Sequence, residues 1–170
     1  MHGHLTCVRV WIYSQVHLND DSVLSVVTYA VAHLKVKHGE FAPVSRVRMG
    51  LIRYPSLVVV VGHSQCGGAA ACLKAADGPP PPDKPTVPLL RWLTPLTNLV
   101  RTLDLGLLGP AEALSLVVKE NVKQQVQNLA KTDPIKEAWA QGQDVQIHGW
   151  VYNIPTGTLA DLGVTVTHKK

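Results

Sequence analysis

Four consecutive valines, Val58 to Val61, constrain the fold of this chain more than any other feature of its sequence. β-Branched side chains favour strands, and a run without polar residues fits a strand that is buried on both faces, as in a parallel sheet. The run ends at Gly62, and the small residues from Gly67 to Lys74 suit a helix that packs closely against a sheet. Strand, tight turn and helix in this order predict an α/β fold.

The remainder of the chain extends this prediction to a whole domain. The helical spacing of apolar residues predicts further helices at about 22–34, 89–103, 111–131 and 134–141. An alternating strand and its partner across a turn predict a C-terminal β-hairpin, at 145–152 and 158–164. The expected architecture is therefore a mostly parallel central sheet that is flanked by helices and ends in this hairpin.

Length and composition limit the classes of protein to which the chain can belong. Its 170 residues fit a single domain, and we expect 1–170 to form one buried core. With 46% hydrophobic and 16% charged residues, the chain is expected to be globular rather than disordered. The formal net charge is +4, but the lysines and arginines are scattered, so we expect no nucleic-acid partner.

Cysteine usage and the lack of apolar segments indicate the compartment. No apolar run reaches the roughly 18 residues of a membrane span, and the first residues lack the order of a signal peptide. The three cysteines, Cys7, Cys66 and Cys72, are too few and too irregularly spaced for a disulfide framework. We therefore expect a cytoplasmic protein without a membrane partner, in which a conspicuous cysteine binds metal or takes part in catalysis.

The turn after the valine strand carries the residues best suited to chemistry, with the sequence GHSQCGG at 62–68. Zinc takes imidazole nitrogen and thiolate sulfur, and a His-x-x-Cys spacing at the mouth of a turn can direct both ligands at one ion. The N-terminus of the following helix favours the negative charge of a thiolate or a bound anion. His63 and Cys66 are therefore the candidate zinc ligands, and the alternative is that they are incidental residues of the turn.

The segment from Val58 to Cys72, VVVVGHSQCGGAAAC, resembles the second zinc motif of the β-class carbonic anhydrases. Other parts of the chain are similar to the same family, and the proline-containing segment after Cys72 is similar to its fungal members. These parts are SVLSVVTYAVAHLKVKH at 22–38, ENVK at 120–123 and HGWVYNIPTGTLADLGV at 148–164.

The resemblance implies a carbonate dehydratase, a zinc enzyme that interconverts carbon dioxide and bicarbonate. In that family two cysteines and one histidine hold the zinc, which lowers the pKa of a bound water toward neutrality so that it can attack carbon dioxide. An aspartate and an arginine of a Cys-x-Asp-x-Arg motif orient the site. Members bind carbon dioxide at a dimer interface, so the resemblance also implies a homodimer or a higher homo-oligomer.

Two departures from the family pattern bear on activity. His63 and Cys66 match the second and third zinc ligands, but the Cys-x-Asp-x-Arg motif is not found, and no catalytic residue is assigned. Cys7, which is followed by Val8 and Arg9, is the only conceivable substitute. Residues 39–57 have a loop-like composition where the family joins helix to strand directly. The domain is therefore expected to be N-terminally incomplete, with an atypical insertion at about 39–57.

Several hypotheses follow from these departures. The chain is an enzyme in which Cys7 or another arrangement completes the site, or an inactive homologue that acts as an interaction or oligomer subunit. A third hypothesis is a faulty gene model whose product does not fold stably. A redox pair of Cys66 and Cys72 is a weaker rival, because the spacing is not Cys-x-x-Cys, and Cys72 is expected to be a small core residue.

Overall fold

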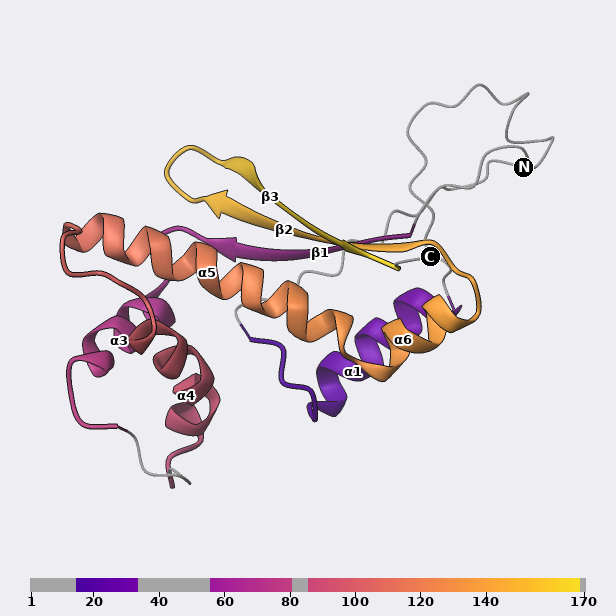
Figure 1. Ribbon diagram of the computed structural model, residues 1–170, viewed down its shortest axis with the longest axis horizontal. Coiled ribbons are helices and arrows are strands. Elements are labelled where there is room, and N and C mark those ends of the chain that lie inside the picture. The colour runs from indigo at the N-terminus through magenta and orange to yellow at the C-terminus, as the bar shows by residue number, and fades with distance from the viewer. Residues whose placement is uncertain (1–14, 34–55, 81–85, 169–170) are drawn as a thin grey trace.

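The computed structural model describes residues 15–33, 56–80 and 86–168 (Figure 1). The helices and strands of these residues follow one another in an α/β order. They are α1 (Asp21–Thr28), the π-helical turn η1 (Tyr29–His33), β1 (Ser56–His63), α3 (Gly67–Ala76), α4 (Pro88–Arg101), α5 (Pro110–Ala130), α6 (Asp133–Ala140), β2 (Val145–Asn153) and β3 (Thr158–Thr167).

The three strands form one sheet in the order β1-β2-β3. β1 pairs with β2 in parallel, from Ser56 opposite Val145 to His63 opposite Tyr152. β3 then pairs with β2 in the antiparallel sense and completes the predicted hairpin, with a register shift between Gly149 and Trp150. The α/β class is therefore confirmed, and the sheet of the described residues is mixed, with its parallel part at β1 and β2.

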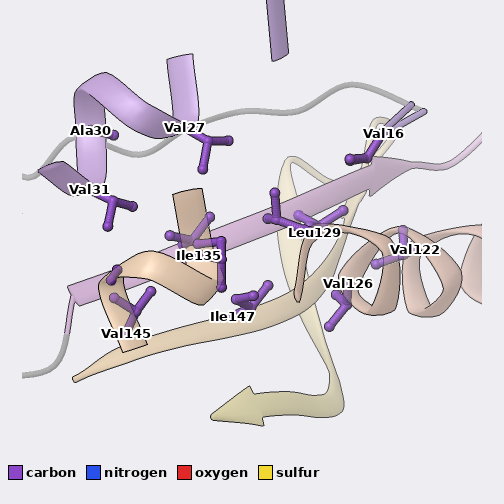
Figure 2. Packing of buried hydrophobic residues seen from close by; sticks show 13 residues of the cluster. Val16, Val27, Ala30, Val31, Val122, Val126, Leu129, Ile135, Val145 and Ile147 are labelled. Carbon is purple, nitrogen blue, oxygen red and sulfur yellow. The ribbon is translucent and has the colours of Figure 1, made fainter. Parts of the chain in front are cut away.

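The helices of the described residues lie on one side of this sheet, with α5 running along the strands (Figure 1). The main core cluster joins α1, η1, α5 and α6 to that face of the sheet, and Figure 2 shows its side chains converging between the helices and the strands. Its fully or almost fully buried members are Val27, Val58, Val60, Val122, Val126, Leu129, Ile135, Val145 and Ile147.

Two glycines allow α5 to approach the sheet closely. A Cβ atom added to Gly62 would lie 2.6 Å from Cγ2 of Val122, and one added to Gly149 would lie 3.0 Å from Cγ1 of the same valine. Val122 is itself buried, in the main core cluster. The glycines on β1 and β2 therefore set the distance between α5 and the strands that carry the candidate site.

A second core cluster packs α3 and α4 against the N-terminal half of α5, through buried residues such as Cys72, Leu96 and Val117. Arg101 of α4 closes the C-terminal end of α3. Its Nη2 atom donates to the carbonyl oxygens of Ala75, Gly78 and Pro79, at 3.2, 3.2 and 2.9 Å. The helix that begins at the candidate site is thus fixed at both ends, by the sheet and by α4.

The first helix differs in part from its prediction. Asp20 caps α1 as its acidic side chain predicts, since Oδ1 accepts a hydrogen bond from the backbone nitrogen of Ser22 at 2.9 Å. The α-helical geometry ends at Thr28, however, and the chain continues as the π-helical turn η1 rather than as one helix to residue 34. β-Branched residues such as Val26 and Val27 weaken the α-helical preference of this segment.

The other predicted elements are confirmed, with small differences at their ends. α4, α5 and α6 lie where helices at 89–103, 111–131 and 134–141 were predicted, and β3 extends three residues beyond 164, to Thr167. Of the predicted insertion at about 39–57, the structure describes Ser56 and Leu57, which pair with β2 as part of β1. Its other residues lie outside the described ranges. No helix among the described residues is long and apolar enough to cross a membrane.

Candidate metal centre

The two predicted zinc ligands lie on either side of one tight turn at the carboxyl end of β1. His63 is the last residue of β1, and Cys66 is the N-cap of α3. Both side chains are half-buried. The fold therefore brings the predicted ligands to the same end of the parallel strands, which is where α/β proteins bind their ligands.

The backbone of the turn is held in an uncommon conformation. Gln65 has a φ of 57° and is the only non-glycine residue with a positive φ among those that the structure describes. Such a conformation costs on the order of 1 kcal/mol for a residue with a side chain. Gln65 thus lies in the short turn between His63, the last residue of β1, and Cys66, the N-cap of α3.

Ser64 ties this turn to the C-terminal hairpin. Its backbone nitrogen donates to the carbonyl oxygen of Tyr152 at 2.9 Å, and its Oγ atom accepts from the backbone nitrogen of Ile154, also at 2.9 Å. The roles of Ser64 and Gln65 were missed from the sequence. Their only signal there is their position between the two candidate ligands.

A hydrogen bond orients the imidazole of His63 for metal binding. Nδ1 lies 2.9 Å from the carbonyl oxygen of Ser64. A carbonyl oxygen can only accept, so Nδ1 carries the proton and the neutral ring has its lone pair on Nε2. Histidine ligands of zinc are usually oriented by such a bond from their other ring nitrogen. The ring of His63 therefore fits a zinc ligand that binds through Nε2.

Cys66 presents a thiol at the beginning of α3. The residue has extended backbone angles, φ −66° and ψ 115°, and its side chain makes no capping hydrogen bond to the helix. It takes no part in a disulfide. The positive end of the α3 dipole lies at this residue, which suits a soft anionic ligand. His63 and Cys66 thus offer the nitrogen and sulfur donors that zinc prefers.

The described residues offer these two donors without a third. Among 15–33, 56–80 and 86–168, no group of three or more His, Cys, Asp or Glu side chains could hold a metal ion. Cys7 and its neighbours lie outside these ranges. Asp20, just before the first helix, is occupied as the cap of α1.

Cys72 is a core residue, as predicted. It is 1% exposed, and Sγ lies 3.7 Å from the carbonyl oxygen of Leu93. Burial raises the pKa of its thiol, against the opposing effect of a hydrogen bond with Thr97. A buried thiol with a raised pKa is a poor nucleophile and a poor metal ligand, so the redox pair of Cys66 and Cys72 gains no support.

Two other described histidines, His17 and His148, lie in structural surroundings. The ring of His17 packs against that of Trp92, with 6.3 Å between their centroids. Nδ1 of His148 lies 3.0 Å from the hydroxyl of Thr165 on the neighbouring strand. Neither histidine belongs to a group of three or more potential metal ligands among the described residues.

The sequence from just before β1 to the hairpin matches the family model of carbonic anhydrases, over residues 54–159. The chain belongs to the carbonic anhydrase family. A carbonic anhydrase of Emericella nidulans is 30% identical over 150 residues, which make up 85% of this chain and 53% of that protein. The chain spans about half the length of the curated relatives that it matches.

Solved structures place this carbonic anhydrase chain in the β class. It is similar to the Coccomyxa β-carbonic anhydrase in complex with acetazolamide, with a TM-score of 0.66 and 26% identity over 89% of this chain and 58% of that one. It is also similar to one of two tetrameric β-carbonic anhydrases from Sordaria macrospora, with a TM-score of 0.58 and 28% identity. That match covers 89% of this chain and 64% of the other. The predicted family is therefore confirmed.

Proposed function

We propose that this chain catalyses the reversible hydration of carbon dioxide to bicarbonate, with zinc held by His63 and Cys66. The observation that carries the proposal is the orientation of His63, whose Nδ1 bonds to the Ser64 carbonyl while Cys66 starts the next helix across the turn. This is the arrangement expected of two zinc ligands with their supporting contacts. Membership of the carbonic anhydrase family supports the same reaction.

Zinc bound there would supply a water molecule acidic enough to act as a nucleophile near neutral pH. The chain's own residues hold the ligands in place. Ser64 orients the ring of His63 through its carbonyl oxygen and fixes the turn to the hairpin through its Oγ atom. Since a catalytic zinc site needs three protein ligands, we propose Cys7 as the third, because Cys72 is buried in the core.

A second function is favoured by the lack of a third donor within the described ranges. In it, the chain is an inactive homologue that folds and serves as an interaction or oligomer subunit. Loss of one ligand lowers zinc affinity by several kcal/mol, on the order of a third of the total for a structural site. In either function we propose a homo-oligomer, since the Sordaria relatives are described as tetrameric. Two unpaired cysteines also support a cytoplasmic location.

Zinc content per folded chain tests these functions first. We expect about one zinc per wild-type chain, and loss of that zinc in Cys66→Ala, in His63→Ala and in Cys7→Ala. Cys72→Ala is the matched control, because it removes a thiol that the proposal leaves in the core. Circular dichroism of each variant separates loss of metal from loss of fold.

Carbon dioxide hydration, followed by stopped-flow with a pH indicator, is then measured on the same samples. Activity that disappears with the zinc in Cys66→Ala and persists in Cys72→Ala supports the enzyme. A folded wild type that oligomerises in analytical ultracentrifugation, but holds no zinc and hydrates no carbon dioxide, contradicts the enzyme and supports the inactive subunit. If Cys7→Ala still binds zinc, Cys7 is not the third ligand, and the rest of the proposal stands.

A further inference from the structure

A pocket lies next to the metal-binding turn, between the turn and the N-terminal half of α5. Its volume is about 180 Å³. Its walls are mostly apolar, with a few hydroxyl and amide groups and no charged side chain. The main lining residues are Leu114, Val118, Val151, Ser64, Gln65 and Ser115.

The pocket and the candidate metal ligand His63 lie on opposite sides of the sheet. Val118 belongs to α5, and Val151 packs against both core clusters on the helix-covered side. Gly62 also faces α5, and side chains alternate along a strand, so the side chain of His63 points to the other side. The turn at Ser64 and Gln65 is the element that the two sites share.

We propose that this pocket binds a small, neutral, largely apolar molecule, about the size of phenol, and that its occupancy favours metal binding at the turn. The volume suits such a molecule, since a cavity of about 150 Å³ with an apolar lining binds benzene in a well-studied case. The uncharged lining disfavours anions, because no cationic side chain replaces their lost hydration. The hydroxyl groups of Ser64 and Ser115 suit one polar group on the ligand.

The link between the two sites runs through Ser64. Ser64 lines the pocket, its carbonyl oxygen accepts from Nδ1 of His63, and its Oγ atom accepts from the backbone nitrogen of Ile154. Gln65, the next residue, also lines the pocket, and its φ of 57° is specific to the present geometry of the turn. A molecule in the pocket therefore favours the turn geometry that orients His63. This coupling rests on the proposed zinc site, whereas binding in the pocket does not.

Binding is tested by titrating the whole chain with phenol while methyl NMR signals of Leu114, Val118 and Val151 are followed. We expect saturable shifts with a dissociation constant on the order of 1 mM, given the few heavy atoms of phenol and the partly open pocket. Ser115→Phe, at an exposed position of α5 that lines the pocket, should weaken binding about tenfold or more by filling the space. Gln127→Phe is the matched control on an exposed position of α5 outside the pocket, and it should leave binding unchanged.

Benzoate separates a neutral site from an anion site. It has the same ring as phenol but a charged and somewhat larger carboxylate in place of the hydroxyl group, so we expect it to bind at least about tenfold more weakly. Shifts that do not saturate with phenol, equal binding in folded Ser115→Phe, or tighter binding of benzoate than of phenol would each overturn the proposed ligand class.

The coupling is tested with Cd²⁺ as the metal probe, through the thiolate absorbance that Cys66→Ala should abolish. Saturating phenol is expected to tighten Cd²⁺ binding about threefold to tenfold, and Cd²⁺ should tighten phenol binding by the same factor. An unchanged Cd²⁺ affinity with phenol bound overturns the proposed coupling, but not the proposed binding of phenol in the pocket. A chain that binds phenol but no Cd²⁺ at Cys66 contradicts both the coupling and the proposed zinc site, while the pocket stands.

Discussion

The two faces of the sheet differ in what covers them and in what they carry. The face toward α5 presents Val58, Val60 and Gly62 from β1, beside Ile147 and Gly149 from β2. All are buried, and the helices α1, α5 and α6 pack against them. None of these five residues is charged, and a methyl group added at Gly62 would lie 2.6 Å from Val122.

The opposite face presents the alternate residues of the same strands, and among them is His63. His148 and Trp150 of β2 also lie on this face. Nε2 of His148 and Nε1 of Trp150 are buried without a hydrogen-bond partner among the described residues. An unpaired buried polar atom costs about 1–3 kcal/mol. The strand period of two thus places the candidate ligand His63 on one face of the sheet and the residues that pack against α5 on the other.

The largest loss of unfolding free energy is expected for Leu129→Ala, which truncates a side chain in the helix-covered core. Leu129 is 0% exposed in the core between α5 and the sheet, and truncation should lower the free energy of unfolding by about 3–5 kcal/mol. The same change at Leu159 on β3, which is 40% exposed, should cost less than about 1 kcal/mol. Urea unfolding measures both. Equal losses would mean that the helix-covered core is not the main source of stability.

Two adjacent valines compare the faces directly. Val60 is 2% exposed and belongs to the main core cluster, whereas Val61 is 6% exposed and faces the other side. We expect Val60→Ala to lower the free energy of unfolding by about 2 kcal/mol, and Val61→Ala by about 1 kcal/mol, because Val61 belongs to neither core cluster of the described residues. The midpoint of urea unfolding, with equal slopes, measures the difference. A larger loss for Val61→Ala would show that the second face is the more tightly packed.

A polar contact also lies on the helix side, and its loss should have an intermediate effect. Oε1 of Gln125 accepts from the backbone nitrogen of Val16 at 2.9 Å, and its Nε2 donates to Oδ1 of Asn121 at 2.8 Å. Gln125→Leu leaves the buried nitrogen of Val16 without this acceptor and should cost about 1–2 kcal/mol. The control Gln124→Leu removes only an exposed bond to Asn128 and should cost about 0.3 kcal/mol.

Thermal unfolding of these two variants measures that difference. Equal melting temperatures for Gln125→Leu and Gln124→Leu would mean that the contact with Val16 does not hold the chain against α5. A lower melting temperature for Gln125→Leu alone supports a polar clamp between α5 and the segment that leads into α1.

The elements that form the face toward α5 were predicted well, because the spacing of apolar residues along the chain determines which side chains are buried there. The run from Val58 to Val61 and the helical spacing in α5 each indicate their own element, and burial follows from their pattern. The clamp at Gln125 was not predicted, because glutamine is usually exposed and its partner Val16 is more than one hundred residues away. Contacts of that kind have no local signal in the sequence.

The candidate site was predictable in part. The spacing of His63 and Cys66 identified the turn, since both ligands come from one short segment. What Ser64 does depends on Tyr152 and Ile154, which the fold brings from the hairpin, and no spacing along the chain reveals it. The π-helical turn after Thr28 was also missed, because helical periodicity alone does not distinguish it from a regular α-helix.

The smallest expected effect concerns His148, on the face opposite α5. Burial lowers the pKa of its ring below the ordinary value of about 6.5, against the opposing charge of Asp161. The unfolded chain therefore binds a proton at a higher pH than the folded one. Stability from this group is complete above about pH 6.5 and decreases as the pH falls toward the lowered pKa, because only the unfolded state takes up the proton there.

His148→Gln isolates this contribution, since the amide cannot titrate and can still bond to the hydroxyl of Thr165. Between pH 7 and pH 5, wild type should lose slightly more unfolding free energy than the variant, by less than about 1 kcal/mol because the ring is partly exposed. Urea unfolding at several pH values measures it. If both proteins change equally with pH, burial does not hold His148 neutral. The face that carries His63 would then be open to water at His148, in contrast to the dry face beneath α5.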